Sequence, residues 1–284
     1  MKIGIIPVNV GVQSLDQLVG LARHAEAHGV ESLWTFEHVV MPEDYASKYP
    51  YSPNGKMGIP PETPFIDPLI ALTAIAAATS TVRLGTGVNI LSQANPLLLA
   101  KQVASLDVLS GGRFMLGAGI GWLEEEYRAM GVPFERRGAR FDDYVAAMRK
   151  VWAGETVEHQ SEFLDWTGFK SYPLPVQTPF PVVIGGSKGK AHARIARLGN
   201  GWYAPSADPE EIAGHLEGIR AACAEIGRDP AEIEVTANWV PAMGIDRLRA
   251  LQDVGVARVV VMTFALGDPM DGIRKLSDEV IGKL

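Results

Sequence analysis

Short apolar runs alternate with amphipathic segments along the chain. Eight runs rich in β-branched residues predict strands, and the segments between them carry apolar residues at helical spacing. The helix pattern is clearest at 14–29, which ends at a glycine, and at 208–227, which opens with an Asp cap followed by Pro. The predicted strands are 3–8, 32–37, 82–90, 113–118, 181–184, 202–204, 233–240 and 257–264.

Eight strands that alternate with helices predict an α/β fold, a (β/α)8 TIM barrel, because eight is the number of strands that closes this fold. An open doubly wound sheet is the alternative, and the lack of a phosphate-binding glycine fingerprint at Gly11 weakens it. Two insertions exceed ordinary connections. Segment 41–64, after strand 2, is a candidate lid or a plain surface loop, and 155–180, before strand 5, predicts a hairpin. We expect one domain, 1–284.

Composition narrows the class of protein. Hydrophobic residues make up 47% of the 284 residues, the net charge is −7, and no apolar run is long enough to span a membrane. The negative charge argues against nucleic-acid binding, and a single cysteine, Cys223, excludes an internal disulfide and a cysteine-rich metal site. The N-terminus lacks the pattern of a secretory signal. We expect a cytoplasmic homodimer that binds a small-molecule substrate and no metal.

Candidate chemistry lies at the predicted carboxyl ends of the strands, where barrels hold their ligands. The strand at 32–37 ends in Glu37 and His38. A histidine there can move a proton near neutral pH, and a neighbouring carboxylate can raise its pKa or fix its tautomer. A histidine satisfied by the backbone at a strand end is the plainer interpretation, and position alone favours it.

Glycines interrupt two of the predicted strands. Gly85 and Gly87 lie in the middle of 82–90, although glycine weakens a strand. Gly117, Gly119 and Gly121 occupy the point where the next strand turns into a helix. A glycine lets a flat ligand approach the backbone closely, but a G-x-G-x-G pattern alone is a weak signal.

A stronger signal follows the strand at 181–184. Gly185, Gly186 and Ser187 lead into a predicted helix whose first turns hold Lys188 and Lys190. Cations are disfavoured at a helix N-terminus, so a bound anion would explain these two lysines. A solvated charged helix is the alternative. The basic face continues with Arg194 and Arg197.

Several stretches together resemble the bacterial-luciferase-like superfamily of flavin and deazaflavin oxidoreductases. They are "RLGTGVNIL", "NPLLLAKQVASLDVLSGGRFMLGAGIGWLEEEYRAMGVPFERRGARFDDYVAAMRKVW", "YPLPVQTPFPVVIGGS" and "ARIARLGNGW". The resemblance covers residues 2–266 and is greatest to the short branch that uses coenzyme F420 as a hydride carrier. It therefore implies a luciferase-like TIM barrel.

The resemblance also implies a cofactor site. Members carry a non-proline cis peptide in a bulged third strand that backs the coenzyme ring, and the matching bond is Gly87–Val88. Glu37 and His38 match an acidic–His pair beside the deazaflavin, with His38 the leading candidate for proton transfer to the substrate. Together with the glycine-rich turns and the lysines described above, this makes the candidate cofactor-binding residues Gly87, Val88, Asn89, Gly119, Gly121, Gly185, Gly186, Ser187 and Lys188.

The sequence departs from the family pattern at several positions, and these departures restrict which of the family's reactions we expect. The member that oxidises a sugar phosphate has a glutamate where this chain has Trp122, so we do not expect that reaction. The segment "LSQANP" lacks the usual Pro and Arg, and Asn200 replaces the usual acidic residue before Gly-Trp. Glu124 and Glu125 are predicted to cap a helix. Arg136, Arg137 and Arg140 are predicted to pair with Asp142, Asp143 or the glutamate run.

Three functions remain open. The first is an F420-dependent oxidoreductase that moves hydride between the deazaflavin and a small, fairly apolar organic substrate. The second is an FMN-dependent luciferase-like monooxygenase that uses reduced flavin and oxygen, and the third is an idle barrel that only carries a flavin. The basic segment after strand 5 favours F420, whose tail is polyanionic, and His38 beside the ring argues against a mere carrier.

Overall fold

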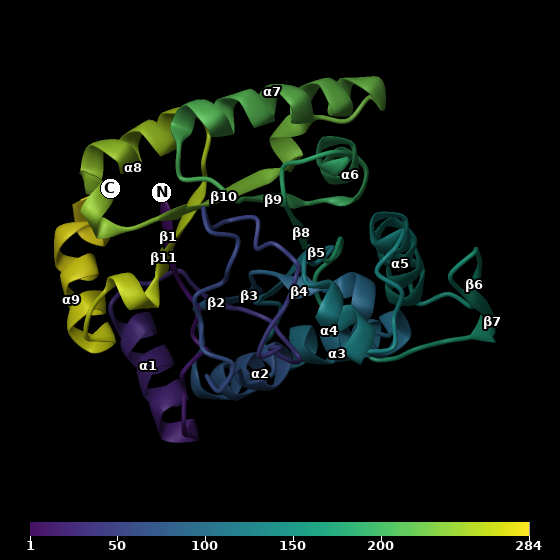
Figure 1. Cartoon of the computed structure of the whole chain (residues 1–284), viewed down its shortest axis with the longest axis horizontal. Helices are drawn as coiled ribbons and strands as arrows, with labels where there is room; N and C mark the ends of the chain where they lie inside the picture. Colours follow the sequence, from purple (N-terminus) through teal and green to yellow (C-terminus); the bar gives the residue numbers. More distant parts are fainter. Residues whose placement is uncertain (284) are drawn as a thin grey trace.

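Eight parallel strand positions close into a barrel, which confirms the predicted (β/α)8 architecture (Figure 1). The computed structural model describes residues 1–283. β1 pairs with β2 on one side and with β11 on the other, and a β3–β5 pairing closes the ring. The strands are β1 (Lys2–Ile6), β2 (Ser32–Thr35), β3 (Arg83–Thr86), β4 (Asn89–Ile90), β5 (Phe114–Gly119), β8 (Val182–Gly185), β9 (Gly201–Ala204), β10 (Glu234–Trp239) and β11 (Arg258–Met262).

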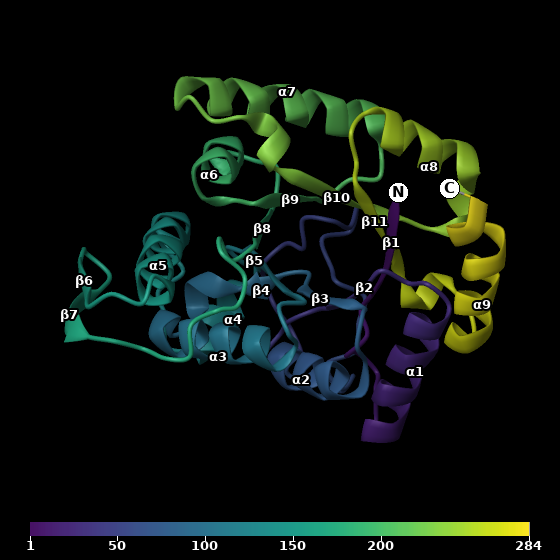
Figure 2. The ribbon, with the colours of Figure 1, turned by 180° about the vertical axis from the view of Figure 1, so that it is seen from behind.

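Helices surround the barrel, as the view from behind shows (Figure 2). Several begin where a side chain caps free backbone N–H groups: Ser14, Asp67, Asn95 and Asp208 each accept one or two of them. None of the helices within residues 1–283 is long and apolar enough to cross a membrane. The α-helices are α1 (Leu15–Ala27), α2 (Pro68–Ala78), α3 (Pro96–Leu109), α4 (Glu124–Ala129), α5 (Arg137–Trp152), α6 (Ala191–Leu198), α7 (Pro209–Glu225), α8 (Gly244–Asp253) and α9 (Pro269–Glu279), with short 3₁₀ turns η1 (Leu91–Gln93), η2 (Pro230–Glu232), η3 (Pro241–Met243), η4 (Thr263–Ala265) and η5 (Ile281–Lys283).

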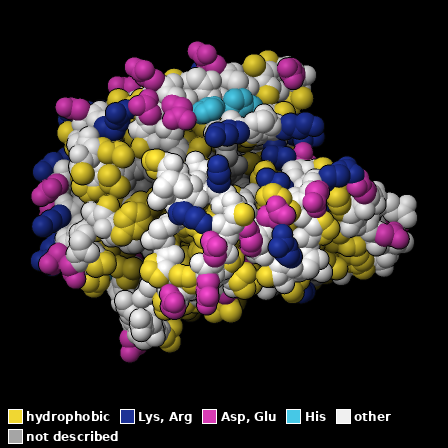
Figure 3. Space-filling view, in the orientation of Figure 1, with side chains coloured by type: hydrophobic (Ala, Val, Ile, Leu, Met, Phe, Trp, Pro, Cys, Tyr) yellow, Lys and Arg dark blue, Asp and Glu magenta, His cyan; other side chains and the backbone are white. Residues whose placement is uncertain are grey.

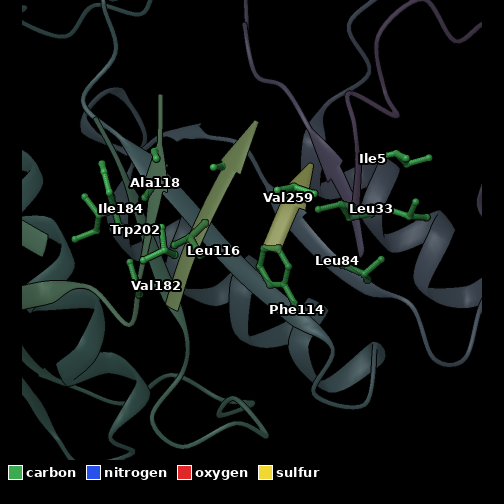
Figure 4. Close-up of a cluster of buried hydrophobic side chains, with 14 of the residues drawn as sticks. Ile5, Leu33, Leu84, Phe114, Leu116, Ala118, Val182, Ile184, Trp202 and Val259 are labelled. Atoms are coloured by element: carbon green, nitrogen blue, oxygen red, sulfur yellow. The ribbon is translucent and has the colours of Figure 1, made fainter. Parts of the chain in front are cut away.

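Each barrel strand buries both of its faces. Outward-facing side chains such as Leu33, Phe114 and Val259 belong to the large buried cluster that fills the space between strands and helices (Figure 4). This double burial explains why the strands read as nearly continuous apolar runs. A second cluster comprises Ile6, Trp34, Met115, Val183, Tyr203 and Val260.

Arg258 is one of the charged residues of the interior. It is fully buried and pairs with Glu31 through two hydrogen bonds of 2.8 Å, and also with Glu234. These partners hold the pKa of Arg258 above its ordinary value, although burial alone would lower it. The buried charge is therefore compensated by two carboxylates.

The predicted strand 82–90 is divided, so its prediction as one continuous strand was wrong. β3 ends at Thr86, the Gly87–Val88 peptide is cis as expected, and β4 pairs Asn89 with Ala118. The hairpin expected within 155–180 is present as β6 (Val157–Gln160) and β7 (Asp165–Phe169), which project from the barrel (Figure 1).

Gly85 has a packing reason that does not involve a ligand. A Cβ atom at this position would lie 2.4 Å from Cε3 of the buried Trp34 ring. We therefore expect Gly85→Ala to lower the free energy of unfolding by about 1–3 kcal/mol through overpacking. Urea unfolding measures this, with Gly20→Ala as a control, since a Cβ at Gly20 meets no atom within 4 Å. Equal stability of Gly85→Ala and its parent would contradict this packing role.

Candidate active site

His38 lies just beyond the carboxyl end of β2, against a buried carboxylate. Its Nδ1 is 2.9 Å from Oε2 of Glu126, and the two side chains are only 6% and 1% exposed. The other oxygen of Glu126 accepts the backbone N–H of Val39 at 2.6 Å and of Val40 at 3.4 Å. A carboxylate at Nδ1 requires a proton on that nitrogen, so in the neutral ring Nε2 is the free acceptor.

The sequence interpretation missed Glu126, although the chain carries a signal for it. Glu126 stands three residues after Leu123 and directly before Tyr127, and these two apolar side chains are each 1% exposed. Helical spacing thus places the third glutamate of the run on the apolar face of α4, unlike Glu124 and Glu125. A carboxylate on a buried helix face needs partners, and His38 is one of them.

Glu37 lies beside the strand break. Its Oε2 accepts the backbone N–H of Ile90 at 2.5 Å, which ties the end of β2 to β4. Burial raises the pKa of Glu37 to about 8, the Ile90 N–H opposes this rise, and the neighbouring Glu126 and Asp67 carboxylates add to it. Glu37 is therefore largely protonated at neutral pH and can donate a hydrogen bond or a proton.

Aromatic rings surround His38. Phe65 and Trp122 meet the imidazole edge to face, with ring centres 5.9 and 6.0 Å away. Tyr45 and Tyr49, both in the 41–64 insertion, pack against Trp122 at 5.5 and 5.1 Å. The insertion therefore covers the side of the site where Trp122 stands, as a lid would.

Glu125 stands in the first turn of α4, as expected, and it also holds this insertion. Its Oε1 accepts the backbone N–H groups of Ala46 at 2.7 Å and Ser47 at 3.2 Å, while the Ser47 hydroxyl accepts the N–H of Glu124 at 3.0 Å. Burial favours the neutral carboxyl, but these hydrogen bonds outweigh it and lower the pKa of Glu125 to about 2. The Glu125 carboxylate therefore stays negatively charged near neutral pH.

The sequence pattern of the luciferase-like monooxygenase family matches residues 4–272. The chain belongs to this family. An uncharacterised protein of Mycobacterium tuberculosis is 34% identical over 244 residues, which cover 86% of this chain and 83% of the relative. The F420-dependent hydroxymycolic acid dehydrogenase of the same species is 27% identical over 241 residues, covering 83% of this chain and 61% of that protein.

Solved structures share the fold of this luciferase-like chain. The coenzyme F420-dependent tetrahydromethanopterin reductase of Methanopyrus kandleri superposes with a TM-score of 0.80 over 99% of this chain and 98% of its own, at 17% identity. The oxygenating constituent of 3,6-diketocamphane monooxygenase of Pseudomonas putida, solved with FMN, gives a TM-score of 0.74 over 100% and 99%, at 15% identity. At these identities the likeness concerns the fold alone.

Three of the glycines that were predicted to bind the cofactor have packing roles in this luciferase-like protein. A Cβ at Gly119 would lie 2.7 Å from Val88, and one at Gly185 would lie 3.1 Å from the same side chain. At Gly121, φ is +69° and a Cβ would meet Ile90 at 2.7 Å. These glycines make room for Val88, the second residue of the cis bond, and for Ile90. Direct contact with a coenzyme stays a prediction for them.

Gly186 is different from these glycines. Its φ is +101°, and a Cβ built there meets no atom within 4 Å. The following turn contains Gly189, whose φ of +60° is not helical. Helix α6 therefore begins at Ala191, with Lys190 as its N-cap residue. Lys188 and Lys190 therefore precede the helix, and the prediction that its first turns hold them was wrong.

The predicted basic face of α6 is partly neutralised. Arg194 pairs with Asp142, and Arg197 lies 2.8 Å from the same carboxylate. His192 on α6 lies 3.1 Å from His215 on α7, and histidine, lysine and arginine side chains share this surface in Figure 3. Lys188 and Lys190 are exposed and have no carboxylate partner within residues 1–283.

The three arginines at the start of α5 do not pair as predicted. Arg136 pairs with Glu162 of the hairpin, and the buried Arg140 donates to the backbone oxygens of Ser92, Pro133 and Glu135. Arg137 stacks over the Phe134 ring at 3.7 Å. Asp142 pairs with Arg194 and Arg197, and Asp143 pairs with His159. Arg136 therefore uses Glu162, while Arg137 and Arg140 use backbone carbonyl groups and an aromatic ring.

Proposed function

We propose that this protein is an F420-dependent oxidoreductase that transfers hydride between the deazaflavin and a small, apolar organic substrate. The His38–Glu126 pair carries this proposal. It is a sheltered imidazole with a fixed Nδ1–H, located just beyond the carboxyl end of β2. The 27% identical mycobacterial relative, whose name states F420 dependence, supports the choice of coenzyme.

The residues near His38 fit a flat coenzyme. Asn89, directly after the cis peptide, is only 3% exposed, yet its Oδ1 has no hydrogen-bond partner within residues 1–283. A buried amide without a partner favours a polar ligand at this point. The open space at Gly186 leaves its backbone accessible to a phosphate, with Lys188 and Lys190 beside it. When bound, the coenzyme supplies or accepts the hydride.

The side chains of the site manage the proton that accompanies this hydride. His38 exchanges it at Nε2, because Glu126 holds the proton at Nδ1 and fixes the ring orientation. Phe65 and Trp122 exclude water around the imidazole and present apolar surface to a substrate. We assign no positively charged group to substrate binding, since Lys56 is engaged by Asp44 and by the carbonyl of Tyr45.

An FMN-dependent monooxygenase is the second candidate, and one observation favours it. The pairing of Arg194 and Arg197 with Asp142 leaves Lys188 and Lys190 as the cations at the Gly186 turn. Two lysines suit a single phosphate, as in FMN, as well as the start of a longer anionic tail. The fold likeness to an FMN-bound oxygenase is compatible with this alternative.

Anaerobic and aerobic reactions distinguish these functions. The purified protein is mixed, without oxygen, with reduced F420 and a set of uncharged ketones and enones, and the reappearance of oxidised F420 is followed by absorbance. A parallel aerobic reaction contains reduced FMN and the same compounds. We expect F420 oxidation without oxygen. Product formation only with reduced FMN and oxygen would overturn the proposal in favour of the monooxygenase.

Substitutions at the Gly186 turn test coenzyme binding. Gly186→Val places a β-branched side chain at φ +101°, so we expect F420 affinity to fall by about 10²-fold or more. Lys188→Ala should weaken binding less and reduce its dependence on salt. Lys170→Ala, at an exposed lysine of the protruding hairpin region, is the control. Ultrafiltration measures these affinities, and unchanged values in the first two variants would exclude this turn as the anion site.

A further inference from the structure

Asn238 lies at the carboxyl end of β10 and points into the barrel. Its neighbours Ala237 and Trp239 belong to the large cluster between strands and helices, so the alternation of side chains along a strand turns Asn238 inward. It stands in register with Val260 of β11, a member of the second buried cluster. Barrels hold their ligands at the carboxyl ends of the strands, so Asn238 faces the same mouth as His38.

Tyr203 fixes the orientation of the Asn238 amide. Its hydroxyl donates a hydrogen bond of 2.8 Å to Oδ1 of Asn238. Burial raises the pKa of Tyr203, and the phenols of Tyr49 and Tyr51 add to this rise, so the hydroxyl keeps the proton that it donates. Nδ2 of Asn238 makes no hydrogen bond within residues 1–283, and Asn238 is the one partly exposed residue of 235–239. Two amide N–H groups are therefore free at the barrel mouth.

The ring of Tyr203 connects Asn238 with the cis peptide. A Cβ at Gly87 would lie 3.4 Å from Cε2 of Tyr203, so this ring lies against the first residue of the Gly87–Val88 bond. The hydroxyl of the same ring bonds Asn238. One phenol ring and one hydrogen bond thus separate Asn238 from the peptide at which the proposed coenzyme site begins. A ligand held by the amide would be a neighbour of that coenzyme.

The 41–64 insertion links this amide to the surroundings of His38. Tyr49 of the insertion packs against Trp122 with ring centres 5.1 Å apart, and Trp122 in turn meets His38. The Tyr49 phenol is also close enough to Tyr203 to act on its pKa. One ring of the insertion therefore faces both sides of the mouth, so the two sides border a common space.

The chemistry of this space suits an uncharged ligand that carries an acceptor. Phe36 and Met262, which follow or end β2 and β11, pack against the second buried cluster and are only partly buried, so they present apolar surface at the mouth. The free groups of Asn238 are donors without charge. A ligand with an oxygen acceptor would pair them, whereas a hydrocarbon of the same shape would leave them unpaired, and sites of this kind discriminate strongly.

We propose that Asn238 determines substrate specificity by donating a hydrogen bond from Nδ2 to an uncharged, carbonyl-type oxygen of the substrate. Tyr203 is the positioning residue that aims this amide. The inference rests on the proposed function and deepens it, because it names the polar group that the apolar substrate must carry. No covalent bond forms or breaks in this contact, and proton exchange stays with His38.

The test observes the Asn238 side-chain amide directly. Its pair of Nδ2–H signals in nitrogen–proton NMR spectra is assigned by its loss in Asn238→Asp or Asn238→Leu. The parent is titrated with cyclohexanone, both without coenzyme and with oxidised F420, which has no hydride to give. Methylenecyclohexane, which has a similar shape and no oxygen, is the matched ligand. We expect cyclohexanone to shift the Asn238 signals and methylenecyclohexane to leave them in place.

Affinities of the variants complete the test. Cyclohexanone should bind about tenfold more weakly to Asn238→Leu, which loses the donor and keeps a similar volume, while methylenecyclohexane should bind it as well as the parent. Tyr203→Phe keeps the amide but not its orientation, so it should lose part of the preference for the ketone. Asn95→Asp is the control, because Asn95 is an exposed helix cap and aspartate caps equally well.

Three results would overturn this specificity role. Cyclohexanone could leave the Asn238 signals in place in both samples. Asn238→Leu could lose affinity for both ligands alike, which would show a packing role. Asn238→Leu could also weaken F420 itself tenfold with no change for the ketone, which would make the amide a coenzyme ligand. A separate F420 titration of the parent reports on the proposed function: absent F420 binding, with Asn238 signals that still respond to cyclohexanone, would reject the coenzyme and retain the role of Asn238.

Discussion

His38→Asn should lower turnover by about 10²–10⁴-fold while F420 affinity and thermal stability stay close to those of the parent. The Asn side-chain amide can occupy the position of Nδ1 and donate to Glu126, so the buried carboxylate keeps its partner. What the variant lacks is Nε2, the nitrogen that exchanges the proton. His38→Ala is a poorer test, because it leaves Glu126 buried with fewer donors and lowers stability as well.

A second histidine–carboxylate pair provides the control. His159 bonds Asp143 through Nε2 at 2.8 Å and joins the hairpin to α5, away from the site. His159→Gln places an amide at the Nε2 position, so it should preserve both stability and turnover. If His38→Asn keeps full activity per folded molecule, His38 is a structural residue, and proton transfer must be assigned elsewhere, with Glu37 the next candidate.

Glu37→Gln should remove most of a pH dependence of stability that the parent displays between pH 4.5 and about 8. The pKa of this carboxyl rises from 4.5 to about 8 on folding. Between these values the folded protein binds one more proton than the unfolded chain, so the free energy of unfolding falls as the pH rises. The shift corresponds to about 3–5 kcal/mol, all of it lost above pH 8.

Urea unfolding of parent and variant from pH 4 to 9 measures this effect. Gln keeps an acceptor for the Ile90 N–H and cannot ionise, so the variant should be the more stable protein at pH 9. The difference between the two curves isolates Glu37, because all other titrating groups are shared. Parallel curves over the whole range would show that Glu37 ionises in the folded protein as it does in the unfolded chain.

Strand periodicity was sufficient to predict the barrel, because parallel strands buried on both faces form short apolar runs separated by amphipathic helices. The break within 82–90 was recognised only through the family resemblance, since no local pattern marks Gly87–Val88. Gly85 illustrates why local sequence does not explain such glycines. A glycine is needed there because the ring of Trp34, 51 positions earlier, occupies the space that a Cβ would fill. Contacts of this kind depend on which strands become neighbours.

The site was predictable in part. Position in the barrel made His38 and Glu37 candidates, but the carboxylate that contacts His38 comes from α4. Helical spacing marks Glu126 as the buried glutamate of the run, but not that its partner is His38, 88 positions earlier. Charge pairing was predicted poorly for a related reason. Arg194 and Asp142 are 52 positions apart and meet only because α5 and α6 pack together.

Tryptophan emission tests the central claim most directly, because Trp122 lies 6.0 Å from His38 and a bound deazaflavin ring would quench it. The parent and Trp122→Phe are titrated with F420 and, separately, with FMN. The account predicts that F420 quenches the parent at low concentration, that the loss of emission is much smaller in Trp122→Phe, and that FMN binds far more weakly. Tighter binding of FMN than of F420, or quenching that does not depend on Trp122, would contradict it.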